Sequence, residues 1–224
     1  MGAYYPLFIT SRILYDADRT GAADENVNVT DWVKTNKFIL CVQMGYNGKD
    51  TAASAYKWQW RNDTDNPGGL YSDVASTGEI AWASTSAVLV EGNAVDDAGD
   101  DRRCSAAAGQ SWQDGLENVG DNLTPDSGTF DLGSDSYTEF QAAFDPAAAH
   151  AGDVYSFRLY NNTADAAVNT GTYVTLTIKS DAFNMKVMVD GTWKIVPSAM
   201  VMVNGVWKPV TSMKVMVNGV WKTV

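Results

Sequence analysis

Apolar and polar side chains alternate with a period of two over much of residues 37–181. Residues 56–61 show the pattern most clearly, because every second residue is a tyrosine or a tryptophan and the residues between them are polar. A period of two places one set of side chains on one face of a β-strand. The alternation therefore predicts half-buried strands around a core that contains Phe38, Leu40, Trp58, Trp60, Phe157 and Leu159.

Short runs of this kind, separated by Gly, Asn, Asp and Ser, predict strands at residues 37–44, 55–61, 86–90, 128–132, 137–143, 154–160 and 173–179. No long amphipathic helix is predicted, although residues 111–119 could form one or two helical turns. Many short strands with turn residues between them are typical of an antiparallel β-sandwich of the immunoglobulin-like or jelly-roll kind. We expect an all-β protein with such a sandwich at residues 1–184, beginning with an N-terminal arm.

The C-terminal region, residues 185–224, repeats one short motif three times. MVDGTWK begins at Met188, and MVNGVWK begins at Met202 and again at Met216. Each copy contains Asp-Gly or Asn-Gly, which favours the type I′ turn of a two-residue hairpin because that turn needs positive φ at both central positions. The repeats therefore predict three successive β-hairpins.

A two-residue turn fixes which residues of a hairpin lie opposite one another, and here it places a methionine opposite a tryptophan in each copy. Valines occupy the other face, so both faces are apolar. An isolated hairpin is marginal in water. The hairpins therefore need a covering surface, which is the sandwich, the same region of symmetry-related copies, or another protein. The expected interface residues are Met188, Trp193, Met202, Trp207, Met216, Trp221, Lys194, Lys208 and Lys222.

Charge is divided unequally between the two regions. Residues 185–224 hold five lysines and one aspartate, a balance of +4, whereas residues 1–184 hold 11 basic and 26 acidic residues, a balance of −15. A basic, apolar C-terminal region behind an acidic sandwich predicts docking or self-association through the hairpins. The alternative is that the lysines keep an exposed sheet in solution and protect its edges.

Composition narrows the classes of partner. A net charge of −11 argues against general affinity for nucleic acid, which depends on clustered Lys and Arg. No stretch approaches the roughly 18 apolar residues of a membrane span, and the N-terminus lacks the pattern of a secretory signal. Hydrophobic residues make up 45% of the chain, enough for a core. We expect a protein made in a cytoplasm, with neither nucleic acid nor membrane as a partner.

Motifs for catalysis and for metal binding are missing from the sequence. The single histidine, His150, lies in a predicted loop and is expected to be inert. No nucleophile elbow, phosphate-binding loop or dinucleotide fingerprint occurs, and there is no His/Cys cluster. We therefore predict no catalytic site, no cofactor and no metal.

Carboxylates leave a calcium site open as the alternative to solvated acidic loops. They lie at Asp16, Asp18 and Asp145 and within residues 96–101. The loop that begins at Asp16 starts like an EF-hand, but Val27 stands where the twelfth-position glutamate belongs. This departure favours solvated loops.

The cysteines and tryptophans carry further expectations. Cys41 fits a buried strand, Cys104 is expected to be exposed or half-exposed, and cytoplasmic synthesis argues against a disulfide between them. Exposed tryptophans could form a sugar-binding platform, for which the candidates are Trp58, Trp60, Trp82 and Trp112. Trp58 and Trp60 share a strand face, however, and fit the core more simply.

Three segments of the sandwich region stand out, namely NVNVTDWVKTNKFILCVQMGYNG, AYKWQWRNDTDNPGGLYSDV and YTEFQAAFDPAAAHAGDVYSFRLYNNTADAAVNTGTYVTLTI. Together they resemble a group of β-sandwich proteins encoded largely by tailed bacteriophages and related prophages. The return strand has Tyr71 where that group commonly has tryptophan. The short G-x-W-K-x-V hairpins are also similar to hairpins of phage structural proteins. The resemblance implies a structural protein of a virion or a surface.

The expected function is that of a non-enzymatic bacteriophage virion protein, a capsid decoration (cement) protein located in the virion. Its expected partners are other virion proteins, with the major capsid protein favoured, and further copies of itself in a closed homo-oligomer such as a trimer. The main alternative is a tail-fibre component or surface adhesin, a carbohydrate-binding module for host attachment. A small hydrolase is a third alternative.

Overall fold

The computed structural model describes residues 4–46, 48–95, 102–120, 129–168 and 173–180, together with the backbone of the strands in the C-terminal region. The chain divides into two compact units, Met1–Ser180 and Asp181–Val224, called the body and the tail below. The regular secondary structure of the described residues consists of β-strands alone. The fold is therefore all-β, as the alternating pattern predicts.

One sheet of the body has seven strands. Its main path runs β1–β3–β10–β9–β7, and β6 and β8 also pair with β10. The bounds are β1 (Leu7–Tyr15), β3 (Phe38–Tyr46), β6 (Ala81–Trp82), β7 (Ala94–Val95), β8 (Ser111–Trp112), β9 (Gly115–Val119) and β10 (Ser136–Asp145). Eight of the nine residues of β3 are buried, because one set of side chains joins the core between the sheets and Ile39 and Cys41 join a second buried cluster with Leu14, Ala83 and Leu89. Burial on both faces explains the nearly continuous apolar sequence of β3.

The second sheet of the body has six strands. Its path runs β2–β13–β11–β4–β5, and β12 also pairs with β11. The bounds are β2 (Val29–Trp32), β4 (Tyr56–Asn62), β5 (Ser72–Asp73), β11 (Val154–Asn161), β12 (Ala166–Ala167) and β13 (Thr175–Ile178). The antiparallel pair β4–β11 is the longest in this sheet, and its register places Asn62 opposite Tyr155.

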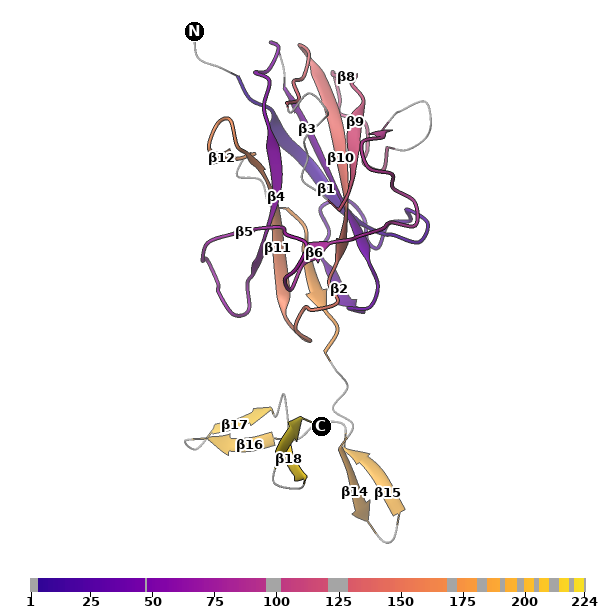
Figure 1. Ribbon diagram of the computed structural model, residues 1–224, viewed down its shortest axis with the longest axis vertical. Coiled ribbons are helices and arrows are strands. Elements are labelled where there is room, and N and C mark those ends of the chain that lie inside the picture. Colours follow the sequence, from indigo (N-terminus) through magenta and orange to yellow (C-terminus); the bar gives the residue numbers. More distant parts are fainter. Residues whose placement is uncertain are drawn as a thin grey trace. The chain divides into compact units, whose positions relative to one another are not determined.

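The two sheets face one another (Figure 1). Aromatic side chains from both sheets belong to one buried cluster. The ring of Phe144 on β10 lies 5.8 Å from that of Trp58 on β4 and 6.2 Å from that of Phe157 on β11. The ring of Phe38 on β3 lies 5.5 Å from that of Phe157. Offset and edge-to-face rings at these separations attract one another in addition to the area that they bury. The body is therefore β-sandwich-like, with its core between the layers.

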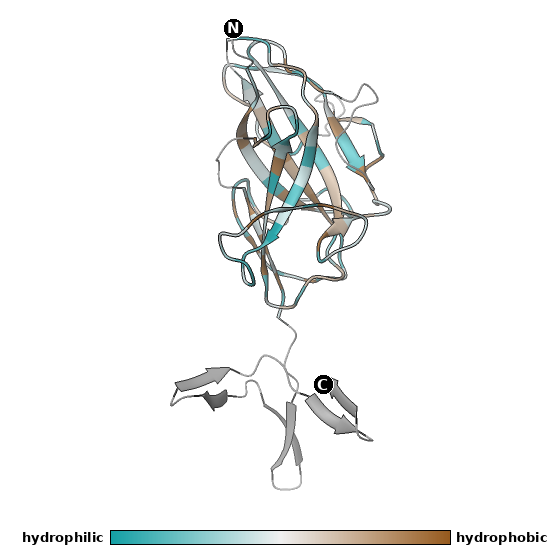
Figure 2. Ribbon diagram, turned by 60° about the vertical axis from the view of Figure 1, so that its left-hand side comes forward, coloured by the Kyte–Doolittle hydropathy of each residue, from teal (hydrophilic) through white to brown (hydrophobic). Residues whose placement is uncertain are grey.

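Five of the predicted strands are confirmed, namely β3, β4, β10, β11 and β13. On β11, buried and partly exposed residues alternate strictly. Figure 2 shows hydrophilic and hydrophobic residues interspersed along the strands of the body. Of the six predicted core residues, five are buried. The sixth, Trp60, is partly buried and packs against the same core.

The strand predicted at residues 86–90 is wrong, because this segment is a loop. The Asp16 carboxylate accepts hydrogen bonds from the Ser86 hydroxyl and, at 3.1 Å, from the backbone N–H of Ala87. The Ser86 hydroxyl in turn accepts one from the N–H of Leu89 at 2.9 Å. Side chains thus satisfy backbone groups that a strand would pair with a neighbouring strand.

The strand predicted at residues 128–132 is also not formed. Gly128 lies outside the described residues, and Phe130 makes an isolated bridge to Ser54. The helical turns considered for residues 111–119 are wrong, because this segment forms β8 and β9, both parallel to β10. Gly115 permits the approach of β9, since a Cβ there would lie 1.8 Å from the carbonyl oxygen of Glu139.

The N-terminal segment is not an arm, because β1 pairs with β3 along nearly its whole length. The sheets are also mixed rather than wholly antiparallel. Besides β8 and β9, which run parallel to β10, strand β2 runs parallel to β13. Two parallel strands need a long connection between them. The segments of the chain between β2 and β13 and between β9 and β10 are long enough.

The tail contains three separate two-stranded antiparallel sheets. They pair β14 (Met185–Val189) with β15 (Thr192–Val196), β16 (Met200–Val203) with β17 (Val206–Pro209), and β18 (Lys214–Val217) with β19 (Val220–Thr223). Their registers place Met188 opposite Trp193, Met202 opposite Trp207 and Met216 opposite Trp221. The Asp-Gly and Asn-Gly pairs themselves lie outside the described residues.

Replacing Phe144 with alanine should destabilise the body by about 3–5 kcal/mol, because it removes a buried ring that contacts four other aromatic rings. Leu70→Ala is the matched control, since Leu70 is 89% exposed and its truncation should change stability by no more than about 0.5 kcal/mol. Denaturant unfolding followed by tryptophan fluorescence measures both. Equal losses for the two variants would contradict this assignment of the core.

Candidate functional site

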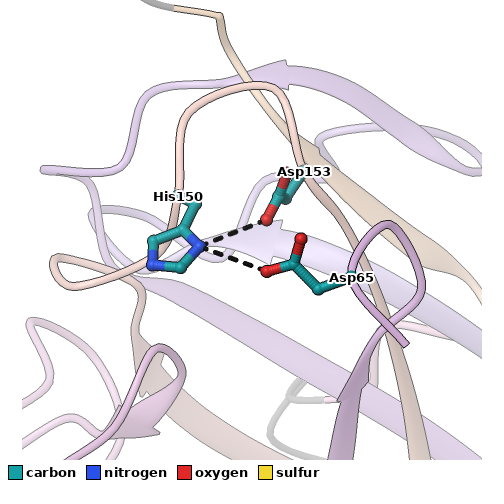
Figure 3. A group of neighbouring side chains, drawn as sticks. All are labelled: Asp65, His150 and Asp153. Carbon is teal, nitrogen blue, oxygen red and sulfur yellow. Dashed lines mark ion pairs between the residues drawn. The ribbon is translucent and has the colours of Figure 1, made fainter. Parts of the chain in front are cut away.

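Two loops at one end of the second sheet bring a histidine and two aspartates together. Asp65 follows β4, whereas His150 and Asp153 lie between β10 and β11. Figure 3 shows the imidazole facing both carboxylates: Nδ1 of His150 lies 3.6 Å from Oδ2 of Asp65 and 3.4 Å from Oδ2 of Asp153. The three potential ligand atoms all lie within 4.8 Å of one another.

The pairing of β4 with β11 explains how residues so far apart in the sequence meet. Asn62, the last residue of β4, is buried, and its side-chain oxygen accepts hydrogen bonds from the backbone N–H of Thr64 at 3.0 Å and of Asp65 at 3.1 Å. Its side-chain nitrogen donates to Asp153 at 2.7 Å. One buried amide therefore positions both aspartates.

The hydroxyl group of Tyr155 holds the backbone of His150 in place. It accepts a hydrogen bond from the backbone N–H of His150 at 3.0 Å and donates one to Oε2 of Glu79 at 2.7 Å. Burial raises the pKa of this hydroxyl, and the bond to Glu79 raises it further, so the group stays protonated and keeps donating. Glu79 also accepts from the side chain of Asn62 at 3.0 Å.

An imidazole nitrogen and two carboxylate oxygens are the donors that a divalent transition metal prefers. The side chains of His150 and Asp65 are 58% and 62% exposed, so the cluster is open to solvent. Sequence reasoning predicted no metal site and placed His150 in an inert loop. The feature that would have revealed the cluster is the pairing of β4 with β11. This pairing brings the loop after β4 next to the loop before β11.

Both cysteines are buried and free, so the expectation that Cys104 is exposed or half-exposed is wrong. Cys104 packs in a buried cluster with Ile39 and Cys41, and its backbone N–H donates to the buried carboxylate of Glu139 at 2.8 Å. Burial raises the pKa of both thiols well above the usual range, and the nearby Glu139 raises it further. Reactive cysteines instead have lowered pKa values, so the chemistry of a thiolate nucleophile is not supported at either position.

The tryptophans considered for a sugar platform do not gather into one. Trp58 and Trp82 are buried, and Trp60 packs against the core. Trp112 is partly exposed, with its ring 5.3 Å from that of Tyr137 and 5.7 Å from the guanidinium of Arg102. Two of the four rings are therefore withdrawn from any sugar-binding surface, and Trp60 and Trp112 are partly exposed.

Several carboxylates considered for calcium accept hydrogen bonds from the protein itself. Asp16 binds Ser86 and Ala87, Asp18 accepts from the backbone N–H of Thr20 at 2.9 Å, and Asp145 accepts from that of Ala147 at 2.9 Å. The carboxylates within residues 96–101 lie outside the described part of the chain.

The predicted interface lies on the tail, of which the structure describes the strand pairing and not the side chains. It therefore places these residues on paired strands without showing what covers them. Within the described residues, no helix is long and apolar enough to cross a membrane.

Comparison of the chain with protein-family models, with curated proteins and with solved structures finds no match.

Tyr155→Phe should lower the free energy of unfolding by about 1–3 kcal/mol, because it leaves the His150 N–H and a Glu79 oxygen without this buried partner. Tyr160→Phe is the control on the same strand. The Tyr160 hydroxyl donates to Asp165 at an exposed position, so its loss should change stability by less than about 0.5 kcal/mol. Urea unfolding of both variants checks the difference, and a larger loss for Tyr160→Phe would contradict it.

Proposed function

We propose that this chain is a non-enzymatic structural protein of a bacteriophage virion, in which the tail attaches the body to the particle. The proposal takes up the resemblance to phage structural proteins suggested by three body segments and by the G-x-W-K-x-V hairpins. Its structural support is the contrast between the body and the tail. The proposal includes a finer fold assignment, a sandwich of the immunoglobulin-like or jelly-roll kind followed by three hairpins.

The observation that supports attachment most directly is the contrast between the two units. The body contains its own core, closed between two sheets by aromatic contacts that join one layer to the other. Each tail sheet has two strands. Two strands are marginally stable in water without a further covering surface, and the repeated Met–Trp register presents the same apolar pair three times. A partner surface is the natural source of the missing stability.

Charge favours the same partner class. The lysines of residues 185–224 give a balance of +4, against −15 for residues 1–184. Copies of the acidic body repel one another, whereas the basic hairpins can approach an acidic surface. The major capsid protein is the favoured partner, and a closed oligomer such as a trimer lets tails of several copies cover one another.

A capsid decoration protein fits better than a tail fibre, because the body is compact and the sequence lacks the long repeats of a fibre shaft. The carbohydrate-binding alternative depended on a tryptophan platform. Burial of Trp58 and Trp82 removes two of its four candidates.

Removal of residues 181–224 should leave a folded body that no longer binds particles lacking the protein. Trp207→Ala in the full chain should weaken binding about 10- to 100-fold, as expected for a buried aromatic at an interface. Trp112→Ala, the same change at a partly exposed position of the body, should leave binding unchanged. Co-sedimentation with stripped particles measures affinity, and circular dichroism checks folding.

Decoration of the particle by the truncated chain at wild-type affinity would place the docking surface on the body instead. Stripped particles should also lose physical stability while keeping their adsorption to cells. Loss of adsorption with unchanged stability would instead support the adhesin.

A further inference from the structure

We propose that Asp65, His150 and Asp153 bind a divalent transition metal ion, with Zn²⁺ as the representative ion. Nδ1 of the histidine lies 3.6 Å and 3.4 Å from the two aspartate oxygens. Ligand atoms that each lie about 2.1 Å from a tetrahedral zinc ion are about 3.4 Å from one another. The two separations that involve the histidine match this spacing, and all three ligand atoms lie within 4.8 Å of one another.

Three carboxylates around the side chain of Asn62 create a local negative charge that favours the binding of a cation. Carboxylate oxygens of three residues, Asp65, Glu79 and Asp153, lie 3.4, 3.0 and 2.7 Å from the side-chain nitrogen of Asn62. That nitrogen carries two hydrogens, so it cannot satisfy all three carboxylates fully. Among the described residues, His150 is the only basic side chain that pairs with these carboxylates. A divalent ion would balance the remaining negative charge.

The ligands are held in place before any ion arrives. Asn62 fixes Asp153 through its nitrogen and the backbone of Asp65 through its oxygen. The Tyr155 hydroxyl fixes the backbone of His150. Outer hydrogen bonds of this kind orient the ligands of natural metal sites and raise their affinity. Because two of the three ligand side chains are more than half exposed, water can complete the coordination.

The donor set distinguishes zinc from calcium. Calcium takes six to eight oxygen ligands and has little preference for imidazole, whereas zinc binds nitrogen and oxygen at low coordination number. His150 is the only histidine of the chain, and both cysteines are buried. The imidazole of His150 is therefore the one histidine ligand that the chain can offer to zinc.

A bound ion would join the loop after β4 to the loop before β11, beside the pairing of Asn62 with Tyr155. Binding to the folded state alone stabilises it by mass action. At a zinc concentration about 100 times the Kd, the Tm of the body should rise by roughly 5–10 °C. This role is independent of the proposed attachment to a virion, because all three ligands belong to the body.

The test uses the full chain purified without a polyhistidine tag and stripped of metal with a chelator. Zn²⁺, and separately Ca²⁺, is titrated by calorimetry and by thermal unfolding. We expect one zinc ion per chain, with binding at least tenfold weaker in His150→Ala and in Asp65→Asn. Asp24→Asn, which makes the same charge change at an exposed position outside the cluster, should bind zinc as the wild type does.

A measurement on the wild-type chain avoids any dependence on variant folding. The single imidazole gives one set of nitrogen-15 signals, and zinc should shift its Nδ1 resonance to the position of a coordinated nitrogen. Zinc affinity unchanged in His150→Ala, or an imidazole signal unaffected by saturating zinc, would overturn the proposal. Tighter binding of calcium than of zinc would overturn it as well, because it would indicate an oxygen-only site elsewhere.

Discussion

Packing of Phe144 against rings from both sheets is the contact on which the rest of the body depends. Its ring meets Phe38 and Trp82 of its own sheet and Trp58 and Phe157 of the opposite sheet. A core of rings in preferred geometries tolerates little displacement of one sheet against the other. The layers, and with them the register of β4 and β11, are thereby fixed.

That register has consequences beyond the core. It places Asn62 opposite Tyr155, and these two side chains hold the loops that carry Asp65, His150 and Asp153. The cluster is therefore set by sheet packing and not by local sequence. A shift of one residue between β4 and β11 would turn the aromatic face outward and separate the cluster at the same time.

The sequence was most informative where one face of a strand is buried and the other is not. On β4 and β11 the period of two is clear, so the strands and most of their buried residues could be predicted. On β1 a register shift between Phe8 and Thr10 interrupts the pairing with β3. The N-terminal residues, for which the sequence predicts an arm, therefore form a strand without a regular alternation. Residues 111–119 form strands through pairing with β10 and, for β9, also with β7, and these are tertiary contacts that no local pattern records.

The candidate site could be predicted less well than the fold. Its ligands lie in two loops far apart in the sequence, and neither loop has the spacing of a metal motif. If the antiparallel pairing of β4 with β11 were known, a position of Asp65 near Asp153 could be predicted. Asp65 lies just after the end of β4, and Asp153 lies just before the start of β11. In the tail the strand pairing could be predicted from the sequence alone, because Asp-Gly and Asn-Gly turns specify the pairing of the two adjacent strands.

Hydrogen exchange, read by mass spectrometry on the full chain free in solution and mixed with the virion particle proposed above, distinguishes a self-contained tail from one that a partner completes. Amides of β3, β10 and β11 should exchange slowly in both states, because the body has its own core. Amides of β14–β19 should exchange rapidly in the free chain and slowly on the particle. Equally slow exchange of the tail in the free monomer would show a self-sufficient sheet and would contradict the claim that the tail is completed by a partner.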